Sequence, residues 1–166
     1  MRFVFEQRIA GEPDAVQAVF LEPGFYADLA GLPNLGAPVL LGQERRGDTV
    51  LQRVRYRFSG DLAPAARAVL DPARLTWVDE SVHDLAARTV RFRMLPDHYG
   101  DRLTCSGTYR FTAAGPGATV RTTDGELKVR ALFVAGAVER AIVGGLRDHL
   151  GAETEVVERW VGRAGS

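Results

Sequence analysis

Three residues that can exchange protons lie close together in the sequence: Asp79, Ser81 and His83. Their alternate spacing would place them on one face of a β-strand, together with Trp77. If Trp77 points into an apolar interior, burial would shift the pKa values of the carboxylate and the imidazole towards a range useful for proton transfer. If this end of the strand leaves the sheet, the charges are solvated. Val78 and Val82 make the opposite face of this strand apolar as well, so both interpretations stay open.

Glu126 is a further titratable residue that could face the same interior. Two converging groups of this kind would suit a cyclase or a dehydratase. Nucleophilic catalysis has less support, because a serine or cysteine nucleophile needs a base held beside it. Cys105 lies in an apolar alternating segment, as a buried structural cysteine would. No Gly-x-Ser-x-Gly elbow surrounds Ser81.

The sequence predicts no metal and no cofactor. Zinc sites need clustered ligands, and the side chains of this kind are scattered: His83, His98, His149 and Cys105. Glu153 follows His149 by one helical turn, but no second pair of ligands has matching spacing. The Gly115-Pro116-Gly117 turn lacks the lysine and Ser/Thr of a phosphate-binding loop.

Hydrophobic periodicity divides the chain into a strand, two short helices, about six further strands and one long helix. Residues 2–10 alternate as a half-buried strand. Glu12-Pro13-Asp14 begins the first short helix, and residues 25–29 form the second. Segregated strands and helices predict an α+β fold with an antiparallel sheet. The length of 166 residues predicts a single domain over residues 1–166.

The six further strands are predicted at residues 39–46, 49–58, 74–83, 89–95, 103–111 and 118–129. Arginines occupy alternate positions in two of them, so one face of the sheet should lie in water and the other should form the core. Several inner residues are aromatic or, in one case, a methionine, and such large side chains suit either a ligand cavity or ordinary core packing. These candidates are Tyr56, Trp77, Phe92, Met94 and Tyr109.

Residues 132–160 have the period of an amphipathic helix. Ile142 and His149 lie on its apolar stripe, which makes them further candidates for ligand contact. His149 could equally be a hydrogen-bonded core histidine. A single helix cannot contact the whole face of a broad twisted sheet. The space that remains between them is either filled by side chains or left as a cavity.

This order of elements resembles the START-like superfamily, the helix-grip fold of START lipid-transfer domains, birch-pollen-allergen-type proteins and polyketide cyclases. The resemblance covers nearly the whole chain and fits a bacterial branch of uncharacterised function. Its local patterns are Glu12-Pro13-Asp14-Ala15-Val16, Pro23-Gly24-Phe25-Tyr26 and Leu75-Thr76-Trp77-Val78. It implies a curved antiparallel sheet of about six to seven strands, two short N-terminal helices and a long C-terminal helix that grips a ligand cavity. Function does not follow from such a fold alone.

Composition limits the partners that the chain could have. The formal net charge is zero, which offers no basic field for nucleic acid. The most apolar stretch, residues 131–146, contains Glu139 and Arg140, so we expect no stable membrane insertion. No signal peptide is visible, and a cytoplasmic location is expected. Nothing in the composition specifies an oligomeric state.

The expected function is the binding of a small hydrophobic or amphipathic molecule, such as a lipid, an isoprenoid or a polyketide-like ring. One alternative is a cyclase or dehydratase type of enzyme that uses acid–base groups in the same cavity. The other is a protein-interaction module, which would present an exposed apolar groove of several hundred Å².

Overall fold

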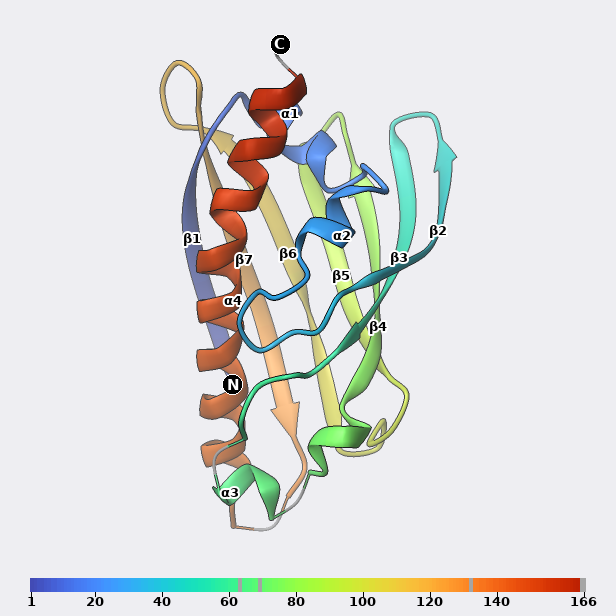
Figure 1. The fold of residues 1–166 in the computed structure, drawn as a ribbon, viewed down its shortest axis with the longest axis vertical. Coiled ribbons are helices and arrows are strands. Elements are labelled where there is room, and N and C mark those ends of the chain that lie inside the picture. Colours follow the sequence, from blue (N-terminus) through green and yellow to red (C-terminus); the bar gives the residue numbers. More distant parts are fainter. Residues whose placement is uncertain (63, 69, 132, 165–166) are drawn as a thin grey trace.

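In the computed structural model, which describes residues 1–62, 64–68, 70–131 and 133–164, one antiparallel sheet curves around a long helix (Figure 1). The elements are β1 (Arg2–Ala10), α1 (Pro13–Val19), α2 (Phe25–Asp28), β2 (Val39–Arg46), β3 (Thr49–Arg57), α3 (Pro64–Arg67), a 3₁₀ turn (Pro72–Arg74), β4 (Thr76–Asp84), β5 (Thr89–Pro96), β6 (Leu103–Ala113), β7 (Ala118–Val129) and α4 (Ala135–Ala164). Apart from α3 and the 3₁₀ turn, which lie between β3 and β4, this is the order expected from the sequence. The expected helix start at Leu132 lies outside the described residues.

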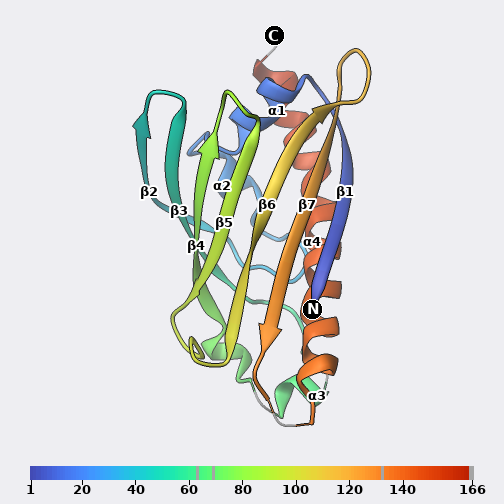
Figure 2. The same ribbon diagram turned by 180° about the vertical axis from the view of Figure 1, so that it is seen from behind.

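The sheet has seven strands in the order β1-β7-β6-β5-β4-β3-β2, and every neighbouring pair is antiparallel. Six strands follow one another in chain order, and β1 joins the far edge beside β7. Helix α4 runs along the concave face near β1 and β7, whereas Figure 2 shows the opposite face with its strands uncovered. The predicted α+β helix-grip fold is therefore confirmed.

The outer face of the sheet carries the alternating arginines. Glu80 of β4 lies between two of them, with its carboxylate oxygens 2.7 Å from Arg53 Nε and 2.5 Å from Arg93 Nη2. These pairs are partly exposed to solvent, where ion pairs contribute at most about 1 kcal/mol each. The arginines therefore mark the wet face, as the sequence predicts, and add little to stability.

Two glycines let aromatic rings lie close to the inner face. Gly107 of β6 and Gly125 of β7 are register partners. A Cβ at Gly107 would lie 2.3 Å from the Asp124 carbonyl oxygen, and one at Gly125 would lie 2.4 Å from the Phe3 ring. Glycine in a strand often marks such a close approach. Any larger residue here would push the strands or the ring at Phe3 out of place.

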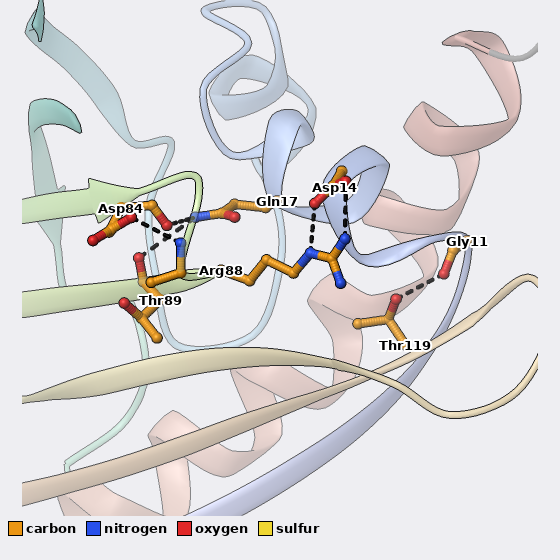
Figure 3. Close-up of polar contacts among 8 residues, drawn as sticks. Gly11, Asp14, Gln17, Asp84, Arg88, Thr89 and Thr119 are labelled. Carbon is orange, nitrogen blue, oxygen red and sulfur yellow. Dashed lines mark hydrogen bonds and ion pairs between the residues drawn. The ribbon is translucent and has the colours of Figure 1, made fainter. Parts of the chain in front are cut away.

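Side chains of helix α1 form hydrogen bonds with the end of the hairpin between β4 and β5 (Figure 3). Arg88 donates to both carboxylate oxygens of Asp14, at 2.7 and 3.1 Å. The buried Gln17 amide donates to the carbonyl oxygens of Asp84 and Thr89, at 3.2 and 3.5 Å. These contacts attach α1 to the end of the β4–β5 hairpin, so the helix covers one end of the concave face.

The segment between α2 and β2 crosses from the sheet to α4 and returns, as the light blue trace in Figure 1 shows. We call residues 31–36 the strap. Asn34 Nδ2 donates to the Gly145 carbonyl oxygen at 3.3 Å, and the Asn34 carbonyl accepts from the Ser59 amide at 3.0 Å. Asn34 has φ 66°, a conformation that asparagine tolerates better than most residues. The strap thus bridges the helix and the sheet.

Two apolar clusters flank the middle of the molecule. One contains Phe3, Leu103 and Leu127 and packs against the first half of α4. The other contains Ile9, Phe25 and Phe111 and packs against α1 and the last turns of α4. No described helix combines the length and hydropathy that a bilayer span requires.

Candidate functional site

Space remains between α4 and the concave face of the sheet, as two adjoining compartments of about 120 and about 140 Å³. Cavities of about 150 Å³ hold one benzene-sized ring in other proteins. Each compartment therefore has room for about one ring. Six residues line both compartments: Leu35, Trp77, Met94, Cys105, Leu146 and His149.

The two compartments differ in their lining. The polar compartment, of about 120 Å³, contains the side chains of Asp79, His83, Arg121 and Glu153 among aromatic residues. The apolar compartment, of about 140 Å³, lies between the first half of α4 and the strap, beside Phe3, Leu62 and Leu127. A molecule that occupied both would meet charged groups at one end and hydrocarbon at the other.

Every residue proposed from the sequence as a ligand contact lies on the wall of this cavity. Trp77, Met94 and His149 line both compartments, Ile142 lines the apolar one, and three aromatic residues line the polar one: Tyr56, Phe92 and Tyr109. The aromatic rings form two stacked pairs. Tyr56 and Trp77 have centroids 5.8 Å apart, and Phe92 and Tyr109 have centroids 4.7 Å apart. Whether these residues bind a ligand stays a prediction.

The inner face of β4 points into the polar compartment. This strand continues to Asp84 and is paired on both sides, with Asp79 opposite Val54 of β3 and Met94 of β5. Asp79, Ser81 and His83 therefore follow Trp77 inwards and all line the compartment. The alternative that this end leaves the sheet and solvates its charges is wrong.

Glu126 does not belong to this group. Its side chain is exposed on the outer face of β7, where its carboxylate lies 3.2 Å from Lys128 Nζ. The inward positions of this part of β7 are Gly125, Leu127 and Val129, which are buried. Since side chains alternate along a strand, Glu126 must point away from the cavity.

Asp79 is an unpaired acid inside the protein. Among the described residues, none forms a hydrogen bond or ion pair with its carboxylate, and the side chain, which is half-buried, lines the compartment. Burial, followed by the charges of Glu153 and Glu80, raises the pKa of Asp79 to about 7. Its carboxyl group therefore changes charge near neutral pH, which is the range in which an acid–base catalyst works.

His83 is also incompletely satisfied. It is 3% exposed, its Nε2 lies 3.2 Å from Ser81 Oγ, and its Nδ1 has no partner in the described part of the chain. An unmet buried polar atom costs about 1–3 kcal/mol. Burial lowers the pKa of His83 to about 4, so the imidazole is neutral at pH 7. It can give or accept a hydrogen bond there but carries no charge.

Arg121 and Glu153 form a buried ion pair that the sequence analysis missed. They are 2% and 5% exposed, and Arg121 Nη2 donates to Glu153 Oε2. Arg121 Nε donates to Gln7 Oε1 at 2.8 Å. The guanidinium lies over the rings of Phe20 and Tyr109, 4.5 and 5.3 Å from their centroids. This network joins β1, β7 and α4 across the polar compartment.

A signal for this network exists in the sequence. Arg121 shares the alternate positions of β7 with Leu127 and Val129, so it falls on the inner face. Gln7 lies between Phe5 and Ile9 on the inner face of β1. A charged residue at an inward position calls for a partner of opposite charge on the facing helix.

Tyr26 and His149, which also line the polar compartment, are bonded to the protein. The Tyr26 hydroxyl donates to the Phe20 carbonyl at 2.7 Å and accepts from Gln52 Nε2, and burial raises the pKa of this phenol. Burial raises the pKa of Cys105 to about 12, which leaves a thiol rather than a nucleophilic thiolate. His149 Nδ1 lies 3.3 Å from the Pro33 carbonyl oxygen of the strap.

The donor set does not resemble a metal centre. Within the described ranges, no three His, Cys, Asp or Glu side chains are grouped as metal ligands would be. Glu153, the partner considered for His149, is instead bound by Arg121. What the arrangement can do is hold a small molecule, and exchange a proton through Asp79.

Comparisons with known proteins agree with this fold. The model of a family described as "Protein of unknown function (DUF2505)" matches residues 5–161. No curated protein matches the chain. The ZhuI aromatase/cyclase from Streptomyces sp. R1128 is 18% identical with a TM-score of 0.69, covering 100% of this chain and 96% of that one.

Two further solved structures are similar over nearly their whole length. TTHA0849 from Thermus thermophilus is 16% identical with a TM-score of 0.67, and the match covers 100% of both chains. Norcoclaurine synthase from Thalictrum flavum is 18% identical with a TM-score of 0.65, covering 97% of this chain and 86% of that one. At such identities the likeness shows the fold alone, which is the helix-grip fold expected from the sequence.

Proposed function

The chain belongs to the DUF2505 family of proteins of unknown function, and from its cavity we propose that it binds a small hydrophobic or amphipathic molecule between α4 and the sheet. The observation that supports this proposal is the space itself, which is lined mainly by apolar and aromatic side chains and contains a few polar groups. Binding pockets for small molecules have this composition.

The size and lining of the two compartments limit the ligand. Space for about one ring in each suits a molecule of two rings, or one ring with a short chain. Affinity would come from burial of apolar surface, at about 25 cal/mol per Å² before the costs of association. Polar atoms of the ligand would lie towards Asp79 and hydrocarbon towards Ile142. The apolar side chains here line an inner space, which favours a small molecule over the protein-interaction alternative.

A second candidate function is acid–base catalysis in the same cavity. The supporting observation is Asp79, whose carboxyl group is unpaired among the described residues and has a pKa of about 7. An acid of this kind could take a proton from a bound substrate and return it at another position, as a cyclase or dehydratase requires. Two structures of the same fold are described as an aromatase/cyclase and a synthase, which adds support by analogy.

Binding can be tested with a probe and a blocked cavity. We expect native mass spectrometry of the protein purified from its own host to show a copurifying small molecule, and calorimetry to detect binding of the neutral ring 2-indanol. Leu146 lies between the two compartments, so Leu146→Trp should fill the space and abolish 2-indanol binding. Leu41→Trp, at an exposed position of β2, is the matched control and should bind normally.

The binding proposal fails if neither a copurifying molecule nor 2-indanol binding is found. It also fails if both tryptophan variants bind 2-indanol as the wild type does. For the second candidate, Asp79→Asn would retain binding and lose turnover of any substrate found. Unchanged turnover in that variant would remove Asp79 from the reaction.

A further inference from the structure

We propose that the ligand of the polar compartment carries a compact cationic group, such as a protonated amine, which Asp79 binds between the two stacked aromatic pairs. The inference rests on the proposed function, since it names the chemistry of the molecule that the cavity holds. It follows from the balance of charge, the aromatic surroundings and an unsatisfied polar atom at the same end of the cavity.

The charge balance leaves one acid without a counterion. Two carboxylates, Asp79 and Glu153, line the compartment, together with one guanidinium, that of Arg121. Arg121 is already engaged by Glu153 and by the side-chain oxygen of Gln7. Asp79 therefore faces the space with no cation beside it in the described part of the chain. A bound cation would supply the missing charge in a medium where such pairs interact strongly.

The aromatic groups near Asp79 also favour a cation over an anion. Along β4, Trp77 lies two residues from Asp79 on the same face and stacks on Tyr56 at an interplanar angle of 14°. On the other side, Phe92 is the register partner of Ser81 and stacks on Tyr109. The faces of such rings are negative and attract ammonium groups, most strongly for tryptophan. An anionic ligand would meet the ring faces and the unpaired carboxylate of Asp79 instead.

His83 gives an independent sign that this end of the cavity is unfinished. The residue is 3% exposed and lines the compartment, yet its Nδ1 lacks a partner among the described residues. Buried polar atoms are nearly always satisfied in folded proteins by protein groups, water or a ligand. An incoming N–H group, or a water carried with it, would supply hydrogen bonds at this end.

The other titratable groups that face Asp79 bear on how pH affects this site. Burial raises the pKa values of four of them, which stay neutral at pH 7: Tyr26, Tyr56, Cys105 and Tyr109. His83 is neutral because burial lowers its pKa, and Arg121 is paired with Glu153. His149 of α4 faces the same space. A variant of Asp79 is therefore needed to assign any effect of pH on binding to Asp79 rather than to His149.

The test compares three probes of one shape and different charge: 2-aminoindane, 2-indanol and indane-2-carboxylate. At pH 8 in calorimetry, we expect 2-aminoindane to bind at least about tenfold more tightly than 2-indanol, and the carboxylate to bind most weakly. In Asp79→Asn, the preference for the amine over the alcohol should fall to within about twofold, while 2-indanol still binds. Glu126→Gln, which removes an exposed acid of the outer face, should keep the full preference.

Proton release provides a second readout that a merely structural role of Asp79 would not produce. At pH 6 Asp79 holds its proton in the free protein, so binding of the amine should release close to one proton per molecule. Calorimetry in two buffers of different ionisation enthalpy measures that number. We expect no proton release when the wild type binds 2-indanol. We also expect none when Asp79→Asn binds 2-aminoindane or 2-indanol.

The outcomes separate this inference from the proposed function. Equal affinity of the wild type for amine and alcohol, or an amine preference that survives in Asp79→Asn, would overturn the inference and leave the binding function standing. Tighter binding of 2-indanol at pH 6 than at pH 8, with no amine preference, would show that Asp79 acts as a neutral donor instead. If none of the three probes binds and no small molecule copurifies, the proposed function fails as well.

Discussion

Two charged residues of the polar compartment illustrate how differently a protein can treat buried charge. Arg121 has Glu153, Gln7 and two aromatic rings around it, so its charge is compensated on all sides. Asp79, on the inner face of β4, has none of these partners within the described residues. An uncompensated buried carboxylate destabilises the folded state, and such groups concentrate at functional sites. This difference makes Asp79 the residue on which the proposals depend.

At the residue scale, Asp79 should make stability depend on pH. The pKa of Asp79 is raised from its usual 3.8 to about 7, so the folded state holds a proton that the unfolded chain has lost. This contribution to stability is complete below pH 3.8 and is lost as pH rises through 7. The wild type should therefore lose about 2 kcal/mol of its free energy of unfolding when the pH is raised from 5 to 8, and Asp79→Asn should not. The difference between Asp79→Asn and the wild type should shift by this amount in favour of the variant. Urea unfolding at the two pH values measures this.

The exposed variant Glu126→Gln is the control for that measurement and should show no comparable gain. A constant difference between Asp79→Asn and the wild type across this pH range would mean that Asp79 has an ordinary pKa. The proton release expected on amine binding at pH 6 would then be lost.

At the scale of elements, β7 and α4 are joined through the interior. Glu153 lies one turn beyond His149 on α4, and Arg121 reaches it from the inner face of β7. Trp160, further along α4, donates from its indole nitrogen to Asp28 of α2 at 2.9 Å. The strap binds the same helix through Asn34 and Gly145. Helix α4 is therefore positioned by polar contacts at several points along its length.

The buried pair between β7 and α4 should behave as a coupled unit. Arg121→Met leaves Glu153 as an unpaired buried charge, and Glu153→Met does the same to Arg121, so each should cost about 3–5 kcal/mol. The double variant replaces both by apolar side chains and should cost clearly less than the two single losses added together. Urea unfolding of the four proteins gives this coupling. Additive losses would mean that the pair does not connect the two elements.

At the scale of the whole molecule, the fold and the cavity come from the same packing. The two apolar clusters share α4 and the sheet, and the cavity lies between their inner surfaces. The chain should then unfold as one unit, which is the single domain predicted from its length. Gly165 and Ser166, at its end, lie outside the described residues.

Two tryptophans offer a test of that unity. Trp77 lines the cavity and Trp160 packs on Phe25 at the far end of α4, with ring centroids 6.2 Å apart. The variant Trp160→Phe keeps only Trp77, so its fluorescence reports on the cavity. The variant Trp77→Phe keeps only Trp160, so its fluorescence reports on the end of α4. We expect each variant to give one transition whose midpoint agrees with that from its own circular dichroism. Disagreement between fluorescence and circular dichroism in either variant would indicate separately unfolding parts.

The sequence by itself determined the order of elements and the two faces of the sheet. Alternation along a strand is a local property, so arginines on one face and aromatic residues on the other could be assigned without coordinates. The same logic placed Tyr56, Phe92 and Tyr109 on the inner face, where the structure has them. It would also have placed Glu126 outside, had the parity of Leu127 and Val129 been followed along β7.

Tertiary structure alone decided what the inner face encloses. Whether the strand containing Asp79 stays in the sheet depends on pairing with β3 and β5, and whether Arg121 meets Glu153 depends on how α4 lies across β7. Neither pairing is visible in local periodicity, because the partners are far apart in the chain. The curved sheet and the helix enclose a certain volume, and the side chains between them occupy only part of it. The space beside Asp79 is what remains. That space exists only once the elements are packed.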